Sequence, residues 1–258
     1  MFTRILCGVD ESPEAIEAVR QARRLAGPDA ELLLVGVLEL NAAVHAGWAA
    51  TQVLDEMRSE QLAALEVARL AAGDHVETQL MRGAPWSEIA ATAHAEEADL
   101  VAVGTHDRWR PAGIVGGSVA TYMLHEAPCS VLIARPCGEP ERFPRSIVAG
   151  FDGSDAAREA LAVARDLAER SDATLRVVAA AGGEKLPLDP IREQAPDASL
   201  DERPPVDALV AESANADLLV VGSRGLHGLA AIGSVSERVA HQAKSSVLVV
   251  RRSIPAKS

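Results

Sequence analysis

Two glycine-rich segments at matching places in the chain could cradle a phosphate. The first reads Gly104-Thr105-His106-Asp107 and, after a spacer of nine residues, Gly117-Ser118; the second reads Gly222-Ser223-Arg224-Gly225 and, after a spacer of seven residues, Gly233-Ser234. Glycines let backbone N–H groups approach an anion, and a helix start adds unpaired N–H groups and the positive end of its dipole. The spacing therefore indicates a phosphate site in each half, although a Gly-Ser before a helix is also a common N-cap.

A carboxylate follows the first apolar run of each half. Asp10 comes directly after the run 5–9, and Asp152 occupies the matching place in the second half. Such a carboxylate can accept hydrogen bonds from an amino or hydroxyl group of a ligand, or it can simply end a strand. If the first and fourth strands of each half are neighbours, the carboxylate and the glycine segment border one crevice.

The two halves are copies of one unit. Residues 5–26 match 147–168 at 11 of 22 positions, and 117–135 match 233–251 at 9 of 19. Between the copies, residues 136–144 contain three prolines and one glycine, which favour neither a strand nor a helix. We therefore expect two domains, at 1–136 and 145–252.

Each half alternates strand and helix patterns. In the first half, apolar runs predict strands at 5–9, 32–38, 76–81, 100–103 and 131–134, and helical spacing predicts helices at 13–26, 48–72, 85–97 and 118–126. This alternation predicts a parallel sheet that is covered on both faces. The second half is shorter, and we expect its second helix to be reduced and a short third strand at 197–203 to remain.

The acid-ended first strand, the Gly-x-x-Gly segment and the later Gly-Ser-Val together resemble the universal stress protein family. Both halves are covered, so the chain is similar to a tandem member. The resemblance implies an α/β fold of two Rossmann-like units, each an open five-stranded parallel sheet in the order 3-2-1-4-5 with helices on both faces. It also implies a stress-response protein that binds ATP without being an enzyme.

The resemblance assigns roles to individual residues. Asp10 and Asp152 would contact the adenine end of the nucleotide, and Val37 and Ala180 would line the base pocket. Ribose and phosphates would be held by Gly104, Gly117, Ser118, Gly222, Gly225, Gly233 and Ser234. Each half departs from the family pattern, because Asp107 replaces a glycine in the first and the spacer of the second is short, so we expect sites of unequal quality.

Further expectations concern cofactors and partners. Magnesium would arrive with the ATP, because no carboxylate cluster forms a metal site of the protein's own, and cyclic AMP stays open as another ligand. By the same resemblance the last strands, 131–134 and 247–250, would pair and make the chain an internal pseudo-dimer. A further homodimer stays open.

Two other functions compete with nucleotide binding. One is an enzyme of related architecture, either an adenylating enzyme or an ATP-pyrophosphatase. Residues 151–155 faintly resemble the phosphate loop of an ATP-pyrophosphatase. However, the sequence has no Walker A motif, no nucleotidyl-transferase histidine signature and no evident general base, so we expect no catalytic residue, and weak ATP hydrolysis stays open as an alternative. The other is a scaffold that has kept the fold and lost its ligand. Asp107 and the short spacer of the second half favour this alternative.

Composition excludes several classes of protein. The net charge of −12 argues against an extended nucleic-acid interface and against anionic membranes. Three cysteines form neither a disulfide framework nor a zinc motif, and no apolar run is long enough to span a bilayer. With no leader-like start, we expect a cytoplasmic protein. His125 and His241 occupy matching places near helix ends, which suits packing or capping.

Overall fold

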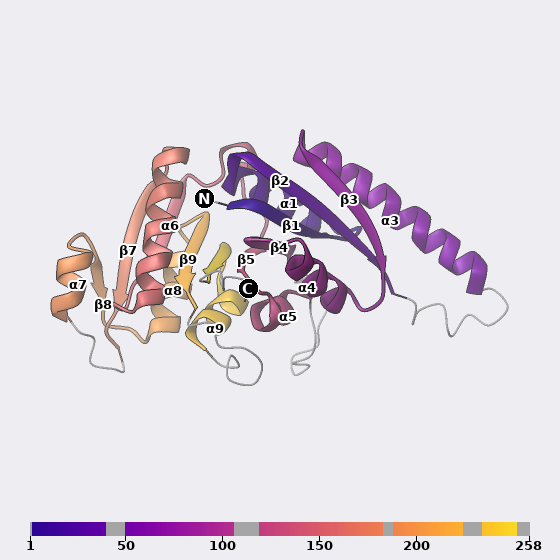
Figure 1. Ribbon diagram of the computed structural model, residues 1–258. Coiled ribbons are helices and arrows are strands. Elements are labelled where there is room, and N and C mark those ends of the chain that lie inside the picture. Colours follow the sequence, from indigo (N-terminus) through magenta and orange to yellow (C-terminus); the bar gives the residue numbers. More distant parts are fainter. Residues whose placement is uncertain (1, 40–49, 106–118, 183–187, 224–233, 252–258) are drawn as a thin grey trace, which may run out of the picture.

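A single ten-stranded sheet runs through the part of the chain that the computed structural model describes, residues 2–39, 50–105, 119–182, 188–223 and 234–251 (Figure 1). The strand order is β3-β2-β1-β4-β5-β10-β9-β6-β7-β8. Each half therefore contributes five parallel strands in the order 3-2-1-4-5, which confirms the predicted topology.

The first half contains the predicted elements. Its strands are β1 (Phe2–Val9), β2 (Ala26–Leu38), β3 (Val76–Arg82), β4 (Leu100–Gly104) and β5 (Ser130–Ala134), and its helices are α1 (Pro13–Leu25), α3 (Ala50–Ala72), α4 (Pro85–Ala95) and α5 (Val119–Glu126). Strand β2 begins earlier than predicted, because Ala26 pairs with Phe2 of β1 before a register shift. Apolar periodicity does not reveal such a pairing.

The second half repeats this plan in reduced form. Its strands are β6 (Ser146–Gly150), β7 (Thr174–Ala180), β8 (Ser199–Asp201), β9 (Leu218–Gly222) and β10 (Ser246–Val250), and its helices are α6 (Asp155–Ser171), α7 (Leu188–Gln194), α8 (Pro205–Ser213) and α9 (Val235–Gln242). Helix α7 has 7 residues where α3 has 23. Between the halves lies only a short 3-10 helix (Pro140–Arg142).

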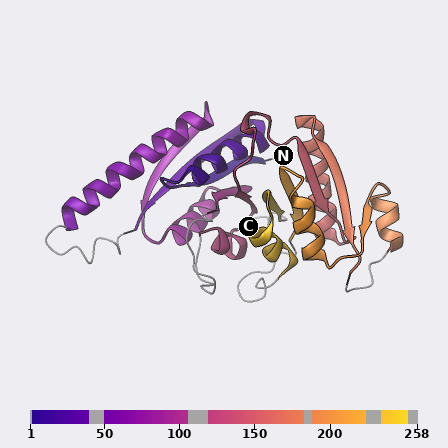
Figure 2. The same cartoon turned by 180° about the vertical axis from the view of Figure 1, so that it is seen from behind.

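Helices cover both faces of the sheet, as Figures 1 and 2 show from opposite sides. Helices α1, α3, α6 and α7 contribute to one hydrophobic core, and α4, α5, α8 and α9 contribute to the other. A strand that is covered on both sides has no polar face, which explains the continuous apolar runs in the sequence. No helix among the described residues is both long enough and apolar enough to cross a membrane.

The two halves join through their last strands. Strand β10 pairs antiparallel with β5, and Leu248 lies opposite Leu132 in the middle of this pairing, which we call the seam. Both side chains are fully buried. The internal pseudo-dimer pairing that the resemblance implied is thereby confirmed.

Arg135 extends from the end of β5 into the second half. Its backbone N–H donates to Ser246 Oγ over 2.9 Å, and its guanidinium donates to Ala240 O over 2.6 Å and to Ser245 O over 3.2 Å. These carbonyls lie at and just beyond the C-terminus of α9, where carbonyl groups lack helical partners and a cation is favourable. Arg135 therefore stabilises the end of the other half's last helix.

Arg251 makes the same connection in the opposite direction. Its backbone N–H donates to Ser130 Oγ over 3.1 Å, and its guanidinium donates to the carbonyls of Leu124 and Ala127 at the end of α5. The two arginines occupy matching positions of the repeat. Each half thus supplies a cation that donates hydrogen bonds to backbone carbonyls at the end of the other half's last helix.

A histidine–carboxylate contact also crosses the seam. Nε2 of His125 on α5 lies 2.9 Å from Oε1 of Glu237 on α9, and Nε2 of His241 lies 4.0 Å from the same oxygen. His125 therefore has a partner in the other half, beyond the packing role that its place near a helix end suggests.

We expect Leu248→Ala to lower the free energy of unfolding by about 2–5 kcal/mol, because it leaves a cavity in the middle of the seam. Urea unfolding followed by circular dichroism measures the loss. Leu70→Ala on α3 is the matched control: Leu70 is 68% exposed, so its loss should stay within about 0.5 kcal/mol. Equal losses in the two variants would contradict the importance of the seam.

Candidate functional site

The sheet brings the predicted carboxylates and glycines together at one edge in each half. Strand β1 pairs with β4, so Asp10, just after β1, and Gly104, the last residue of β4, lie at the carboxyl ends of neighbouring strands. Strand β6 pairs with β9 in the same way and places Asp152 near Gly222. Ligands of open α/β sheets bind at this kind of edge.

Asp10 is fixed by the turn that follows β1. Its Oδ1 accepts hydrogen bonds from the backbone N–H of Ser12 over 2.9 Å and from the Ser12 hydroxyl over 2.5 Å. The Ser12 hydroxyl accepts in turn from the N–H of Ala15 and caps α1. The carboxylate is half-buried and held at the start of this helix, in an orientation set by the turn.

Asp152 makes the equivalent turn in a more open setting. Its Oδ1 accepts from the N–H of Ser154 over 2.9 Å, and Ser154 caps α6 through the N–H of Ala157. Asp152 is exposed where Asp10 is half-buried. The two carboxylates therefore differ in solvation, and a hydrogen bond to the less solvated one is electrostatically stronger.

Helix packing leaves no room for a side chain at Gly104 or Gly222, and the absence of a side chain also suits the approach of a ligand. A Cβ on Gly104 would lie 2.5 Å from the carbonyl carbon of Glu14 in the first turn of α1, and one on Gly222 would meet the backbone of Ala156 in α6 equally closely. The sequence motif did not reveal this requirement, because it depends on how closely the helix approaches the strand. The same approach brings the N-terminus of each helix to the candidate site.

Val37 and Ala180 occupy matching strands with different neighbours. Val37 lies opposite Met81 of β3, and Ala180 lies opposite Asp201 of β8; both are half-buried. Arg203 donates to Asp201 through its guanidinium and backbone, and these hydrogen bonds lower the pKa of that carboxyl to about 2. The wall beside the candidate base pocket is therefore apolar in the first half and ionic in the second.

Gln61, which the sequence did not single out, contacts the end of β1 beside the first candidate site. It lies on α3, is 6% exposed, and donates from Nε2 to the carbonyl of Val9 over 2.7 Å. A Cβ on Gly36 would collide with this amide. Gln61 therefore fixes the last carbonyl before Asp10, a role that only the folded position of the long α3 creates.

Several predicted residues lie outside the described residues: Asp107, Gly117, Ser118, Gly225 and Gly233. Ser234 is described, and its hydroxyl accepts from the N–H of Glu237 over 3.2 Å as the N-cap of α9. The capping interpretation of this serine is therefore correct, and a role in ligand binding would come in addition to it.

The described part of the site offers groups that can bind a ligand. No group of three or more His, Cys, Asp or Glu side chains that could hold a metal ion occurs among the described residues. Burial raises the pKa of the Cys7 thiol on β1 to about 12, so this cysteine is a protonated core residue. Hydrogen-bond acceptors, small residues and helix N-termini remain, and these suit an uncharged base and an anionic group.

Comparisons with known proteins agree with the geometry. The model of the Universal stress protein family matches residues 1–135 and 200–251. The chain is 30% identical to a universal stress protein of Mycolicibacterium smegmatis, over 96% of each chain, and 30% identical to one of Mycobacterium tuberculosis strain H37Rv, over 97% of each. A solved universal stress protein structure from Archaeoglobus fulgidus has the same fold, with a TM-score of 0.78 at 20% identity over 96% of each chain.

We expect Gly104→Ala and Gly222→Ala each to lower the free energy of unfolding by about 1–3 kcal/mol, because the new methyl group would displace the first turn of α1 or α6. Thermal and urea unfolding in the absence of any nucleotide measure the loss. Gly138→Ala in the linker is the control, since a Cβ there meets nothing within 4 Å. If all three variants were equally stable, the close helix approach would not explain these glycines.

Proposed function

The chain belongs to the universal stress protein family, and on that premise we propose that it is a stress-response protein that binds an adenine nucleotide, ATP, without catalysing its turnover. We assign the two binding units to residues 1–136 and 145–252. The proposal rests chiefly on one observation: in both halves a turn-fixed aspartate, a close-packed glycine and a helix N-terminus meet at the carboxyl edge of neighbouring strands.

In the proposed complex each aspartate faces the adenine end of the nucleotide. Asp10 or Asp152 accepts a hydrogen bond from an amino or hydroxyl group, and Val37 or Ala180 packs against the base. Gly104 or Gly222 begins the segment that approaches the phosphates. Gly117, Ser118, Gly225, Gly233 and Ser234 complete the phosphate contacts in this proposal, and magnesium enters with the nucleotide.

The two proposed sites differ in affinity. In the first, the carboxylate is half-buried and Gln61 braces the strand beneath it. In the second, the carboxylate is exposed and an ion pair of Asp201 with Arg203 stands beside the base pocket. Two environments of such different polarity give different binding free energies for the same ligand.

We place the protein in the cytoplasm and propose no nucleic-acid or membrane partner. All three cysteines are free thiols, which suits a reducing compartment. The net charge of −12 opposes association with phosphate backbones and anionic lipid surfaces. Its effect on protein partners would follow from nucleotide-dependent conformation.

The decisive experiment analyses the nucleotide that the purified protein releases on denaturation and measures calorimetric binding of added ATP with magnesium. Release or binding of intact ATP supports the proposal. Release of a turnover product, or hydrolysis during the titration, would instead indicate an enzyme. A protein that neither releases nor binds ATP would be a scaffold without a ligand, and displacement of ATP by cyclic AMP at lower concentration would identify that nucleotide as the ligand.

We expect Asp10→Asn and Asp152→Asn each to weaken one of two ATP affinities by about tenfold or more, since a hydrogen bond to a charged group contributes about 1.5–3 kcal/mol. Asparagine keeps an oxygen for the turn at Ser12 or Ser154, so the fold should persist. Isothermal titration calorimetry resolves the two affinities. Asp74→Asn, an exposed residue before β3, should leave both unchanged, and wild-type binding in the double variant would disprove the assignment.

A further inference from the structure

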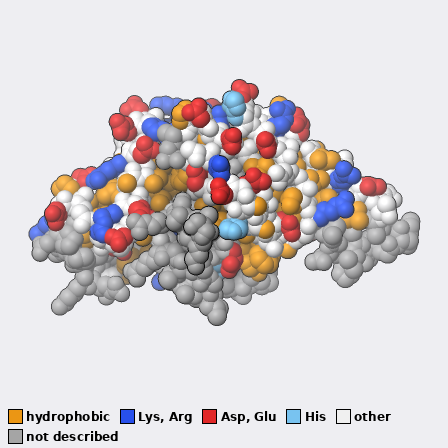
Figure 3. Space-filling model, viewed as in Figure 1, with side chains coloured by type: hydrophobic (Ala, Val, Ile, Leu, Met, Phe, Trp, Pro, Cys, Tyr) orange, Lys and Arg blue, Asp and Glu red, His pale blue; other side chains and the backbone are white. Residues whose placement is uncertain are grey.

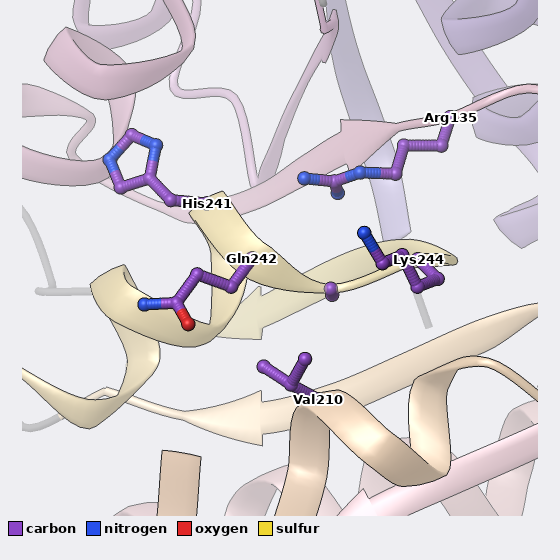
Figure 4. A pocket seen from close by; sticks show the side chains of 6 residues that line it. Arg135, Val210, His241, Gln242 and Lys244 are labelled. Atoms are coloured by element: carbon purple, nitrogen blue, oxygen red, sulfur yellow. The ribbon is translucent and has the colours of Figure 1, made fainter. Parts of the chain in front are cut away.

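A separate pocket of about 410 Å³ lies beside the seam (Figure 4). Arg135 reaches it from the end of β5 in the first half, while every other lining residue belongs to the second half. The lining residues are Arg135, Val210, His241, Gln242, Ala243 and Lys244. A pocket of this volume accommodates a small molecule, and we call it the seam pocket.

The lining of the seam pocket is cationic. Arg135 and Lys244 carry positive charge, Gln242 adds an amide, and the described lining contains no carboxylate. This contrasts with the molecule as a whole, which has a net charge of −12 and carboxylates spread among Lys and Arg over the face drawn in Figure 3. A site with two cations and no carboxylate favours an anionic occupant.

Arg135 is buried and its charged group is fixed by the fold, whereas Lys244 is exposed and is held through its backbone. The buried guanidinium of Arg135 is fixed by its two carbonyl acceptors at the end of α9, and in Figure 4 its side chain and that of Lys244 extend toward the same part of the pocket. The backbone N–H of Lys244 donates to Ser213 Oγ over 2.8 Å. Within the described part of the chain, no carboxylate lies within salt-bridge distance of the Lys244 ammonium.

The internal repeat provides a comparison within the same chain. His241-Gln242-Ala243-Lys244 matches His125-Glu126-Ala127-Pro128 of the first half, so a neutral amide and a cation replace a carboxylate and a proline. Arg251 occupies the place of Arg135 there. The backbone plan is shared, but the cationic lining is specific to the second half, so it does not follow from the packing of the seam alone.

We propose that the seam pocket binds a phosphate group, either as free phosphate or as the monoester of a small molecule. The Lys244 ammonium supplies the charge-assisted hydrogen bond, and Arg135 supplies the electrostatic background. The occupant would contact both halves and so stabilise their pairing. This site is distinct from the two proposed nucleotide sites and does not depend on them.

His241 gives the seam pocket a readout of its own. Burial lowers the pKa of His241, and the charges of Arg135 and His125 lower it further, while Glu237 raises it. Because the pKa is below its usual value, the imidazole is mostly neutral at neutral pH. A bound phosphate would favour the imidazolium and raise this pKa, as linkage requires.

The test is a pH titration of the His241 ring by NMR, in sodium phosphate and in sodium chloride of equal ionic strength, with the resonance assigned from a His241→Gln variant. We expect the titration midpoint to move to higher pH in phosphate and the movement to saturate. Glycerol phosphate provides the monoester arm, and the tighter of the two ligands identifies the form that is bound. An unchanged midpoint with both ligands would overturn the proposal.

Variants separate this pocket from other effects of charge. Lys244→Ala should weaken phosphate binding about tenfold or more, and Gln242→Glu, which imports the carboxylate found at the matching position, should also weaken it by adding a negative charge to the lining. Arg58→Ala, an exposed residue of α3, removes the same charge elsewhere and should have no effect. Equal responses in Lys244→Ala and Arg58→Ala would reject the site, while unchanged ATP binding in Lys244→Ala would keep it separate from the nucleotide proposal.

Discussion

The antiparallel pairing of β5 with β10 determines the arrangement of everything else. All strands within a half are parallel, so this one pairing relates the halves by an approximate twofold axis and places their carboxyl edges at opposite edges of the sheet. The two candidate sites therefore lie apart and cannot share one ligand. The pairing also removes two sheet edges that would otherwise present unpaired N–H and C=O groups.

The reciprocal arginines make this joint specific. Arg135 and Arg251 leave the sheet at equivalent points and satisfy carbonyls at the end of the other half's last helix. Those helices, α9 and α5, begin beside the candidate phosphate segments. A shift of either helix along its axis would therefore strain the hydrogen bonds that it accepts from the arginine of the other half. A buried cation is costly to leave without partners, so the other half would have to move with the helix.

Much of this architecture could be read from the sequence, because the repeat and the alternation of apolar runs are local signals. Asp10 and Gly104 were predicted to meet because strand order places their strands side by side. The role of Gln61, the collision that excludes a side chain at Gly104 and the acceptors of Arg135 could not be predicted. Each depends on a contact between residues far apart in the chain, for which a single sequence carries no periodic signal.

The seam also has a consequence for synthesis on the ribosome. Strand β10 follows every other strand in chain order, so β5 can be completed more than a hundred residues before its partner exists. During that interval the first half has an apolar, unpaired strand edge and an α5 helix without its capping arginine. Such an edge invites pairing with another nascent chain. The protein's exposure to aggregation therefore lasts from the completion of β5 until the last strand docks.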